Sequence, residues 1–102
     1  MRRPIPLPIT KLLGPGLRRL LGAAELELPG ETVGALLHEL AERGGDKLRQ
    51  QLFPGDDEDL SQDARILVNG RNAALLEGLA TPLSARDTVT VYFFGARSFP
   101  GG

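Results

Sequence analysis

The chain has 102 residues, of which 41% are hydrophobic and 25% charged, and its formal net charge at pH 7 is −1. This size and composition are typical of one globular domain with a modest core. The near-neutral charge disfavours a nucleic-acid binder, which usually carries a clear basic excess. The absence of cysteine excludes disulfides, thiolate metal sites and cysteine nucleophiles.

The N-terminal stretch does not resemble a targeting or membrane segment. Two arginines precede apolar residues, but prolines interrupt those residues and no small-residue cleavage site follows. No apolar run approaches the length of a membrane span. We therefore expect a cytoplasmic protein that has no membrane partner.

The first predicted elements are two strands. Between residues 5 and 13, isoleucine and leucine alternate with prolines, which indicates an extended segment whose pairing is more regular toward residues 10–13. Gly14-Pro15-Gly16 predicts a turn, and a short segment follows at residues 17–21. Residues 25–28 alternate between glutamate and leucine and predict the second strand.

A helix is expected after Pro29-Gly30. Thr32 can cap its N-terminus, and apolar residues then recur at helical spacing until Gly44-Gly45 ends the helix. Residues 48–53 indicate a short helical piece, and the acidic stretch after Pro54 has the composition of a loop.

Strands dominate the last third of the chain. Residues 65–68 before Asn69-Gly70 predict a strand and a tight turn, with a short return strand at residues 71–75. A turn at residues 83–87 leads to residues 88–94, which form the strongest strand pattern in the chain. One long helix and several strands predict an α+β domain with the helix packed on one face of the sheet.

No set of side chains indicates catalysis or metal binding. His38, the sole histidine, lies within the helical pattern and is interpreted as a solvated or boundary residue. The serines lack the G-x-S-x-G context, and no glycine run matches a phosphate-binding loop. The acidic run at residues 56–59 lacks the ligand spacing of a calcium loop. We expect neither an enzyme active site nor a metal site.

Residues 95–102 follow the strongest strand and show no structural period. They finish with Gly101-Gly102. Such a stretch is either a frayed terminus or a functional tail. Two glycines without Cβ atoms can thread a narrow channel and present an α-carboxylate to a nucleotide.

Short motifs occur in a defined order along nearly the whole chain. They are Leu12-Leu13-Gly14-Pro15, Leu17-Arg18, Leu21-Gly22, Leu28-Pro29-Gly30-Glu31-Thr32-Val33, Ile66-Leu67-Val68-Asn69-Gly70, Gly78-Leu79-Ala80-Thr81-Pro82-Leu83, Asp87-Thr88-Val89 and Gly101-Gly102. This ordered set resembles the ubiquitin-like sulfur carriers, the family that includes the molybdopterin synthase small subunit and the thiamine-pathway sulfur carrier. The resemblance implies a β-grasp fold, in which a mixed sheet of four to five strands packs on one main helix. It also implies one domain at residues 1–94 and a flexible tail at residues 95–102.

The same resemblance implies a reaction at Gly102. A ubiquitin-activating-like adenylyltransferase would use ATP to adenylate the Gly102 carboxylate, and a sulfur donor of the cysteine desulfurase or rhodanese type would displace AMP to leave a thiocarboxylate. An acceptor such as the molybdopterin synthase large subunit would take the sulfur. Gly101 and Pro100 belong to the tail that enters the partner, and Arg97 is either a charge contact there or a solvated arginine. No tightly bound cofactor is expected, because the activating partner uses the ATP.

Strand parity indicates where partners dock. If Val89, Val91 and Phe93 face the helix, then Tyr92 and Phe94 lie on the opposite face, beside the tail. Exposed aromatic side chains of this kind are binding anchors. The alternative is that a neighbouring loop covers them.

Two departures from the family pattern leave the pathway open. The linker at residues 44–64 is longer than in the shortest members, and residues 96–100 lack the usual run of prolines and small residues. Molybdenum-cofactor (molybdopterin) biosynthesis is the first choice, and the cysteine, thiamine and tungsten-cofactor pathways are alternatives. The chain could also be a modifier joined to lysines through Gly102, or an interaction module that uses its sheet face.

Overall fold

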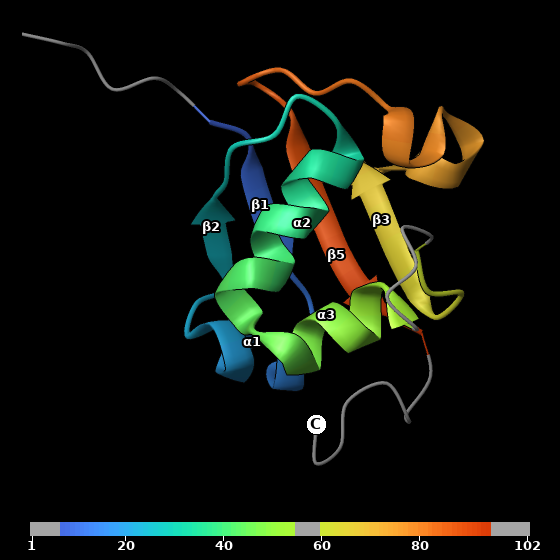
Figure 1. Cartoon of the computed structure of the whole chain (residues 1–102). Coiled ribbons are helices and arrows are strands. Elements are labelled where there is room, and N and C mark those ends of the chain that lie inside the picture. The colour runs from blue at the N-terminus through green and yellow to red at the C-terminus, as the bar shows by residue number, and fades with distance from the viewer. Residues whose placement is uncertain (1–6, 55–59, 95–102) are drawn as a thin grey trace, which may run out of the picture.

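The structure is a computed structural model, and it describes residues 7–54 and 60–94. Its framework is one mixed sheet with strand order β2-β1-β5-β3-β4 (Figure 1). β1 and β5 are parallel, and the other neighbouring strands are antiparallel. The strands are β1 (Ile9–Leu12), β2 (Glu25–Glu27), β3 (Ala64–Val68), β4 (Arg71–Asn72) and β5 (Thr88–Phe93). This is the α+β, β-grasp arrangement that the sequence predicts.

One long helix crosses a face of the sheet, and the shorter helices lie around it (Figure 1). The α-helices are α1 (Pro15–Leu21), α2 (Val33–Gly44) and α3 (Asp46–Leu52), and the 3-10 turns are η2 (Ala73–Leu75) and η3 (Gly78–Ala80). None of the described helices is long and apolar enough to span a membrane.

The predicted central helix is confirmed at both ends. The Thr32 side-chain oxygen accepts a hydrogen bond of 3.2 Å from the Ala35 backbone N–H, as an N-cap does. At the other end Gly45 has a φ of +82°, which a residue without a Cβ adopts at little cost. Along α2, one apolar stripe is buried against the sheet, which fixes the helix on that face. The stripe consists of Val33, Leu36, Leu37, Leu40 and Ala41.

The segment after β1 differs from the prediction. Gly14-Pro15-Gly16 was expected to form a turn, but Pro15 is the first residue of α1. Proline suits that position because its φ is already helical and the N–H it lacks would have no partner there. The left-handed Gly22, with a φ of +73°, ends the helix. Buried Leu17 holds α1 against the core.

The predicted return strand at residues 71–75 is also wrong beyond its first two residues. β4 ends at Asn72, whose side-chain oxygen accepts a 2.9 Å hydrogen bond from the Ala74 backbone N–H. Asparagine favours such local bonds over strand ladders. The chain therefore turns into η2 and leaves the sheet.

Hydrogen bonds connect the turn before β5, which contains Asp87, to the Asn69-Gly70 turn after β3. Asn69 and Gly70 both have positive φ, as a two-residue hairpin turn requires. The Asn69 amide donates to the Asp87 carboxylate at 2.9 Å, and its oxygen accepts from the Thr88 backbone N–H at 2.9 Å. These bonds fix the register with which β5 enters the sheet.

Candidate functional site

The side chains of β5 alternate between the core and the opposite face of the sheet. Val89 and Val91 are fully buried, and Phe93 packs against the core in a partly buried position. Thr90 and Tyr92 are half-buried on the other face. The predicted parity of the strand is therefore confirmed.

Phe94 continues that alternation and is 65% exposed. Its backbone N–H donates to the Asp63 carbonyl at 2.6 Å, which keeps it aligned with the sheet. The Arg65 guanidinium carbon lies 5.5 Å from the centre of the Phe94 ring, a distance typical of a cation–π contact. Arg65 is also paired in register with Tyr92. The structure thus brings Tyr92, Phe94 and Arg65 together.

Sequence reasoning did not identify Arg65. Its place follows from the antiparallel register of β3 on β5, because residues directly opposite each other point to the same face. Ala64 and Ile66 are buried, and the side chain between them must face away from the core. The alternation of apolar and polar residues at the start of β3 in the sequence could have identified Arg65 as a residue of this face.

The rest of this sheet face is also accessible. Ile9 is 38% and Leu13 43% exposed, and Lys11 between them is exposed as well. Lys11 lies opposite Thr90 in the parallel ladder, and the Leu13 backbone N–H donates to the Val91 carbonyl at 3.0 Å. We call this surface the outer face; it comprises Ile9, Lys11, Leu13, Arg65, Thr90, Tyr92 and Phe94. It combines apolar and aromatic contact area with two cations, which suits protein docking better than catalysis.

Four of the predicted site residues lie outside the described residues. These are Arg97, Pro100, Gly101 and Gly102, and the acidic run at residues 56–59 lies outside them too. Of the predicted partner-binding residues, the structure therefore tests the placement of Tyr92 and Phe94.

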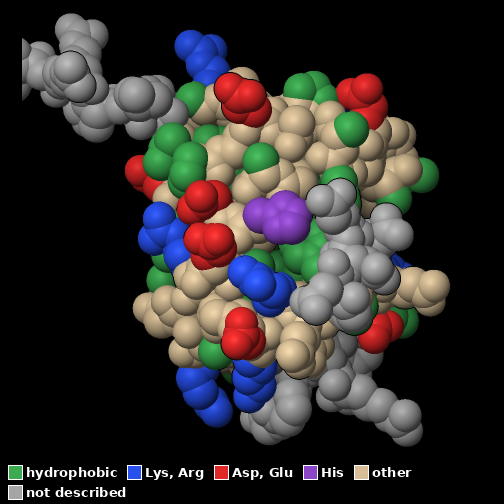
Figure 2. All heavy atoms as spheres, in the orientation of Figure 1, with side chains coloured by type: hydrophobic (Ala, Val, Ile, Leu, Met, Phe, Trp, Pro, Cys, Tyr) green, Lys and Arg blue, Asp and Glu red, His purple; other side chains and the backbone are tan. Residues whose placement is uncertain are grey.

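The sole histidine lies on the helix-covered side, among acidic and basic side chains (Figure 2). The His38 ring is exposed and stacks on Phe53, with 4.4 Å between ring centres and 4° between planes. This contact joins Phe53, the residue that follows α3, to α2. Within residues 7–54 and 60–94, no group of three histidine, aspartate or glutamate side chains is placed to hold a metal ion.

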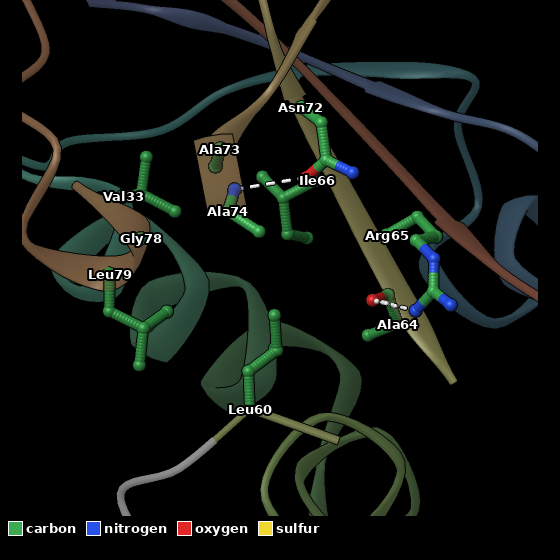
Figure 3. Close-up of a pocket in the computed structure, with 10 residues that line it drawn as sticks. All are labelled: Val33, Leu60, Ala64, Arg65, Ile66, Asn72, Ala73, Ala74, Gly78 and Leu79. Atoms are coloured by element: carbon green, nitrogen blue, oxygen red, sulfur yellow. Dashed lines mark hydrogen bonds between the residues drawn. The ribbon is translucent and has the colours of Figure 1, made fainter. Parts of the chain in front are cut away.

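A pocket of about 570 Å³ opens beside the end of β4 (Figure 3). The side chains of Val33, Leu60 and Leu79 point toward one another across it. Its lining is mainly apolar and contains no pair of acidic or basic groups that could share a proton. The lining residues are Val33, Leu60, Ala64, Arg65, Ile66, Asn72, Ala73, Ala74, Gly78 and Leu79.

A second, more open hollow of about 720 Å³ lies next to the Asn69 turn, with Arg71, Glu77 and Asp87 among its lining residues. Hydrogen bonds from the Ser84 backbone N–H and from the Asn69 amide lower the pKa of Asp87 below its ordinary value of 3.8. These hydrogen bonds outweigh the opposite effect of burial on the Asp87 pKa, so Asp87 is kept as an anion that holds the turn together.

Comparison with protein-family models gives one match. A model described as the ThiS family matches residues 16–92, a range that starts at the second residue of α1, stops one residue before the end of β5 and leaves out β1. Among curated proteins, none matches the chain at the level of sequence.

Solved structures add three informative likenesses. The small archaeal modifier protein 1 from Methanosarcina acetivorans is 30% identical with a TM-score of 0.79, covering 92% of this chain and 98% of that chain. A Pyrococcus furiosus protein provisionally identified as molybdopterin converting factor, subunit 1, is 31% identical with a TM-score of 0.61, covering 85% and 95%. In the Amycolatopsis orientalis BexX/CysO complex, the matching chain is 21% identical with a TM-score of 0.69, covering 85% and 97%, which is a likeness of fold.

Proposed function

Because the chain belongs to the ThiS family of ubiquitin-like sulfur carriers and modifiers, we propose that it carries sulfur as a thiocarboxylate on Gly102. The observation that supports this most is the family match over residues 16–92, which contain most of the core and four of the five strands. The chain supplies the reacting carboxylate, and its partners supply the catalysis.

The chemistry requires activation before sulfur transfer. A carboxylate is a poor acceptor for a sulfur nucleophile because its leaving group would be oxide. An adenylyltransferase first joins the Gly102 carboxylate to the α-phosphate of ATP and releases pyrophosphate. The terminal sulfur of a persulfide, held on a cysteine of a desulfurase or rhodanese, then attacks the carbonyl carbon and AMP departs, which leaves an acyl disulfide. A thiol of a partner then attacks the enzyme-side sulfur of this disulfide; the thiocarboxylate on Gly102 leaves, and the thiol and the enzyme cysteine form a disulfide. No cofactor needs to stay bound to the carrier.

The outer face is the proposed docking surface for these partners. Phe94 and Tyr92 offer aromatic contact area directly before residues 95–102, and Arg65 and Lys11 add positive charge. A partner that covered this face would hold the domain while the tail, with Pro100 and Gly101, entered its active site. Arg97 is placed by its sequence position to make a charge contact along that path. The Amycolatopsis complex is a case in which a protein of this fold is bound to a second protein.

Molybdopterin synthesis is the pathway we propose first. The 31% identity to the Pyrococcus furiosus protein supports it, and the acceptor would then be the large subunit of molybdopterin synthase. The alternative pathways that could use the same thiocarboxylate are cysteine, thiamine and tungsten-cofactor synthesis. We propose that the protein acts in the cytoplasm in each of these pathways.

A modifier role is the second candidate. The 30% identity to the modifier from Methanosarcina acetivorans favours it. In this role, the activated Gly102 would form an isopeptide bond with a lysine of a target protein, and AMP would again be the leaving group. Both roles need the same adenylation step. They differ only in the nucleophile that then attacks the adenylate, which is sulfur in the carrier role and a lysine amine in the modifier role.

The test is an intact-mass measurement. The full chain is incubated with the adenylyltransferase of the same genome, ATP and sodium sulfide, and replacement of one oxygen by sulfur adds about 16 Da. No gain in mass, with an enzyme that forms AMP from ATP on another carrier, would overturn the carrier proposal. Adducts with other proteins that disappear when Gly101-Gly102 is deleted would select the modifier role.

The docking surface is tested in the same reaction. Phe94→Ala and Tyr92→Ala are expected to lower the loading rate about 10-fold or more, because aromatic anchors dominate interfaces of this kind. Glu42→Ala, an exposed change on α2, is the matched control and should load like the wild type. Equal loading of all three variants would contradict docking at the outer face.

A further inference from the structure

The last residue of the described sheet, Phe94, lies beside a backbone segment that the Arg65 side chain also contacts. The Phe94 backbone N–H donates to the Asp63 carbonyl at 2.6 Å. The Arg65 Nη1 donates to the carbonyls on either side of Asp63. One belongs to Gln62, and the other, at 3.1 Å, belongs to Ala64 and is drawn in Figure 3. Three successive carbonyls therefore hold the backbone of Phe94 and the side chain of Arg65 next to each other.

The two bonds from Nη1 fix the place of the Arg65 guanidinium. This nitrogen carries two hydrogens, one for each carbonyl. The guanidinium carbon then lies 5.5 Å from the centre of the Phe94 ring, within the range of about 6 Å that is typical of a cation–π contact. Arg65 is thus anchored to the backbone through one nitrogen while it contacts the ring, so it is placed to hold the ring still.

The orientation of the Phe94 ring affects the path of the chain beyond it. The side chain is 65% exposed, and exposed side chains change rotamer rapidly unless a contact holds them. The rotamers that a side chain can adopt depend on the φ and ψ of its own residue. A ring kept in one rotamer therefore restricts the backbone of Phe94, and the ψ of Phe94 sets the direction in which the chain continues.

We propose that Arg65 is a positioning residue for the loading of Gly102. It holds the Phe94 ring in one rotamer, and through Phe94 it sets the direction in which residues 95–102 leave the domain. A docked partner then receives the tail along one path, so Gly102 reaches the nucleotide in a larger fraction of the docked complexes. The inference rests on the proposed function and adds to it a residue that acts through another side chain.

Arginine suits this role and lysine does not. The guanidinium is planar and presents several donors in a fixed fork, whereas the lysine ammonium is a compact charge on a flexible stem. Arg65→Lys therefore keeps the positive charge of the outer face but loses the anchored geometry over Phe94. A comparison of Arg65→Lys with Arg65→Gln separates positioning from attraction between charges.

The test is the steady-state rate of loading of the full chain by the adenylyltransferase of the same genome, with ATP and sodium sulfide. Arg65→Gln and Arg65→Lys should each lower kcat about 3- to 5-fold, which corresponds to an exposed cation–π contact. KM for the carrier should stay nearly constant, because the rest of the outer face still docks. Lys11→Gln, which removes an outer-face charge opposite Thr90, should instead raise KM. Arg71→Gln, an exposed arginine of β4, is the matched control and should load like the wild type.

A double-mutant cycle tests whether Arg65 acts through Phe94. In a Phe94→Ala background, Arg65→Gln should lower kcat by less than about 2-fold more, because no ring remains to be held. Three-bond couplings measured by NMR on the free carrier give a second readout. They should show one χ1 rotamer of Phe94 in the wild type and averaged rotamers in Arg65→Gln.

Several outcomes would overturn the positioning role of Arg65. Losses that multiply in the double variant, or wild-type loading by Arg65→Lys, would make Arg65 a direct charge contact with the partner. Phe94 rotamers that are averaged equally in the wild type and in Arg65→Gln would show that the guanidinium does not hold the ring. These results differ from a failure of the proposed function, in which the wild type itself gains no sulfur and both proposals fall.

Discussion

Thr10 carries a buried hydroxyl at the centre of the sheet. It is fully buried in β1, between Leu26 of β2 and Val89 of β5 in the ladder. Among the described side chains, its Oγ1 is the buried polar atom without a hydrogen-bond partner. A buried hydroxyl that has lost its hydrogen bonds to water lowers the stability of the folded state.

Thr10→Val should therefore raise the free energy of unfolding by about 1 kcal/mol, because valine has nearly the same shape and no polar atom. Urea unfolding at neutral pH measures the change. Thr90→Val, on the half-exposed outer face of β5, is the control and should change stability by less than about 0.5 kcal/mol. A loss of stability in Thr10→Val would show that the hydroxyl has a favourable partner.

Asp87 gives stability that depends on pH. The Ser84 backbone N–H and the Asn69 amide lower its pKa in the folded state, so its contribution is complete above the pKa of the unfolded chain and is lost as the pH falls through the folded pKa. Asp87→Asn should be less stable than the wild type at pH 7, and the difference should shrink between about pH 5 and the acid range. Urea unfolding at several pH values tests this, and a difference that is the same at every pH would contradict it.

The loop before α2 depends on a close approach that only glycine allows. A Cβ added at Gly30 would come within 2.7 Å of the Leu36 Cβ and backbone nitrogen and within 2.8 Å of its Cα. The backbone cannot move away locally, because the Val33 N–H bonds to the Thr81 carbonyl at 3.0 Å and the Leu83 N–H bonds to the Glu31 carbonyl at 2.9 Å.

Gly30→Ala should lower the free energy of unfolding by about 3 kcal/mol as a result of this overpacking. Gly70→Ala is the comparison, since it meets open space but has a φ of +85°, and it should cost about 1 kcal/mol from backbone strain alone. Thermal and urea unfolding measure both. Equal losses in the two variants would mean that the approach of Gly30 to Leu36 relaxes easily.

At the scale of elements, the sequence predicts what local pattern controls. The apolar stripe and Thr32 cap of α2, the alternation of β5 and the Asn69-Gly70 turn are all local, and the structure confirms them. The segments whose secondary structure was predicted wrongly are those in which a single residue is compatible with two local structures. Pro15 can belong to a turn or begin a helix, and the packing of Leu17 in the core selects the helix. Asn72 ends β4 by bonding to the Ala74 backbone.

The most stable part of the whole molecule is expected where the first and last strands, β1 and β5, pair with each other. β5 is bonded to β1 on one side and to β3 on the other, whereas β2 and β4 are short edge strands. Backbone amides of β1, β3 and β5 should exchange with solvent only through global unfolding, and those of β2, β4 and η2 through local opening. Hydrogen exchange followed by NMR tests this, and uniform protection across the sheet would contradict it.

The candidate site could be predicted only where it lies on one strand. Tyr92 and Phe94 follow from the alternation of β5 alone. Arg65 and Leu13 join them through the pairing of three strands, which a single sequence does not specify. The apolar pocket beside η2 depends on how η2 and η3 fold against α2 and β3, so it is a property of the tertiary structure.

The position of β5 also has a mechanical consequence. A partner that draws residues 95–102 into a channel applies tension along the axis of β5, and this strand is held by ladders on both sides, along Ile9–Leu12 and along Ala64–Val68. Tension parallel to the strand loads these hydrogen bonds together in shear, so they cannot be peeled apart one at a time. The domain can therefore stay folded when a partner pulls on residues 95–102.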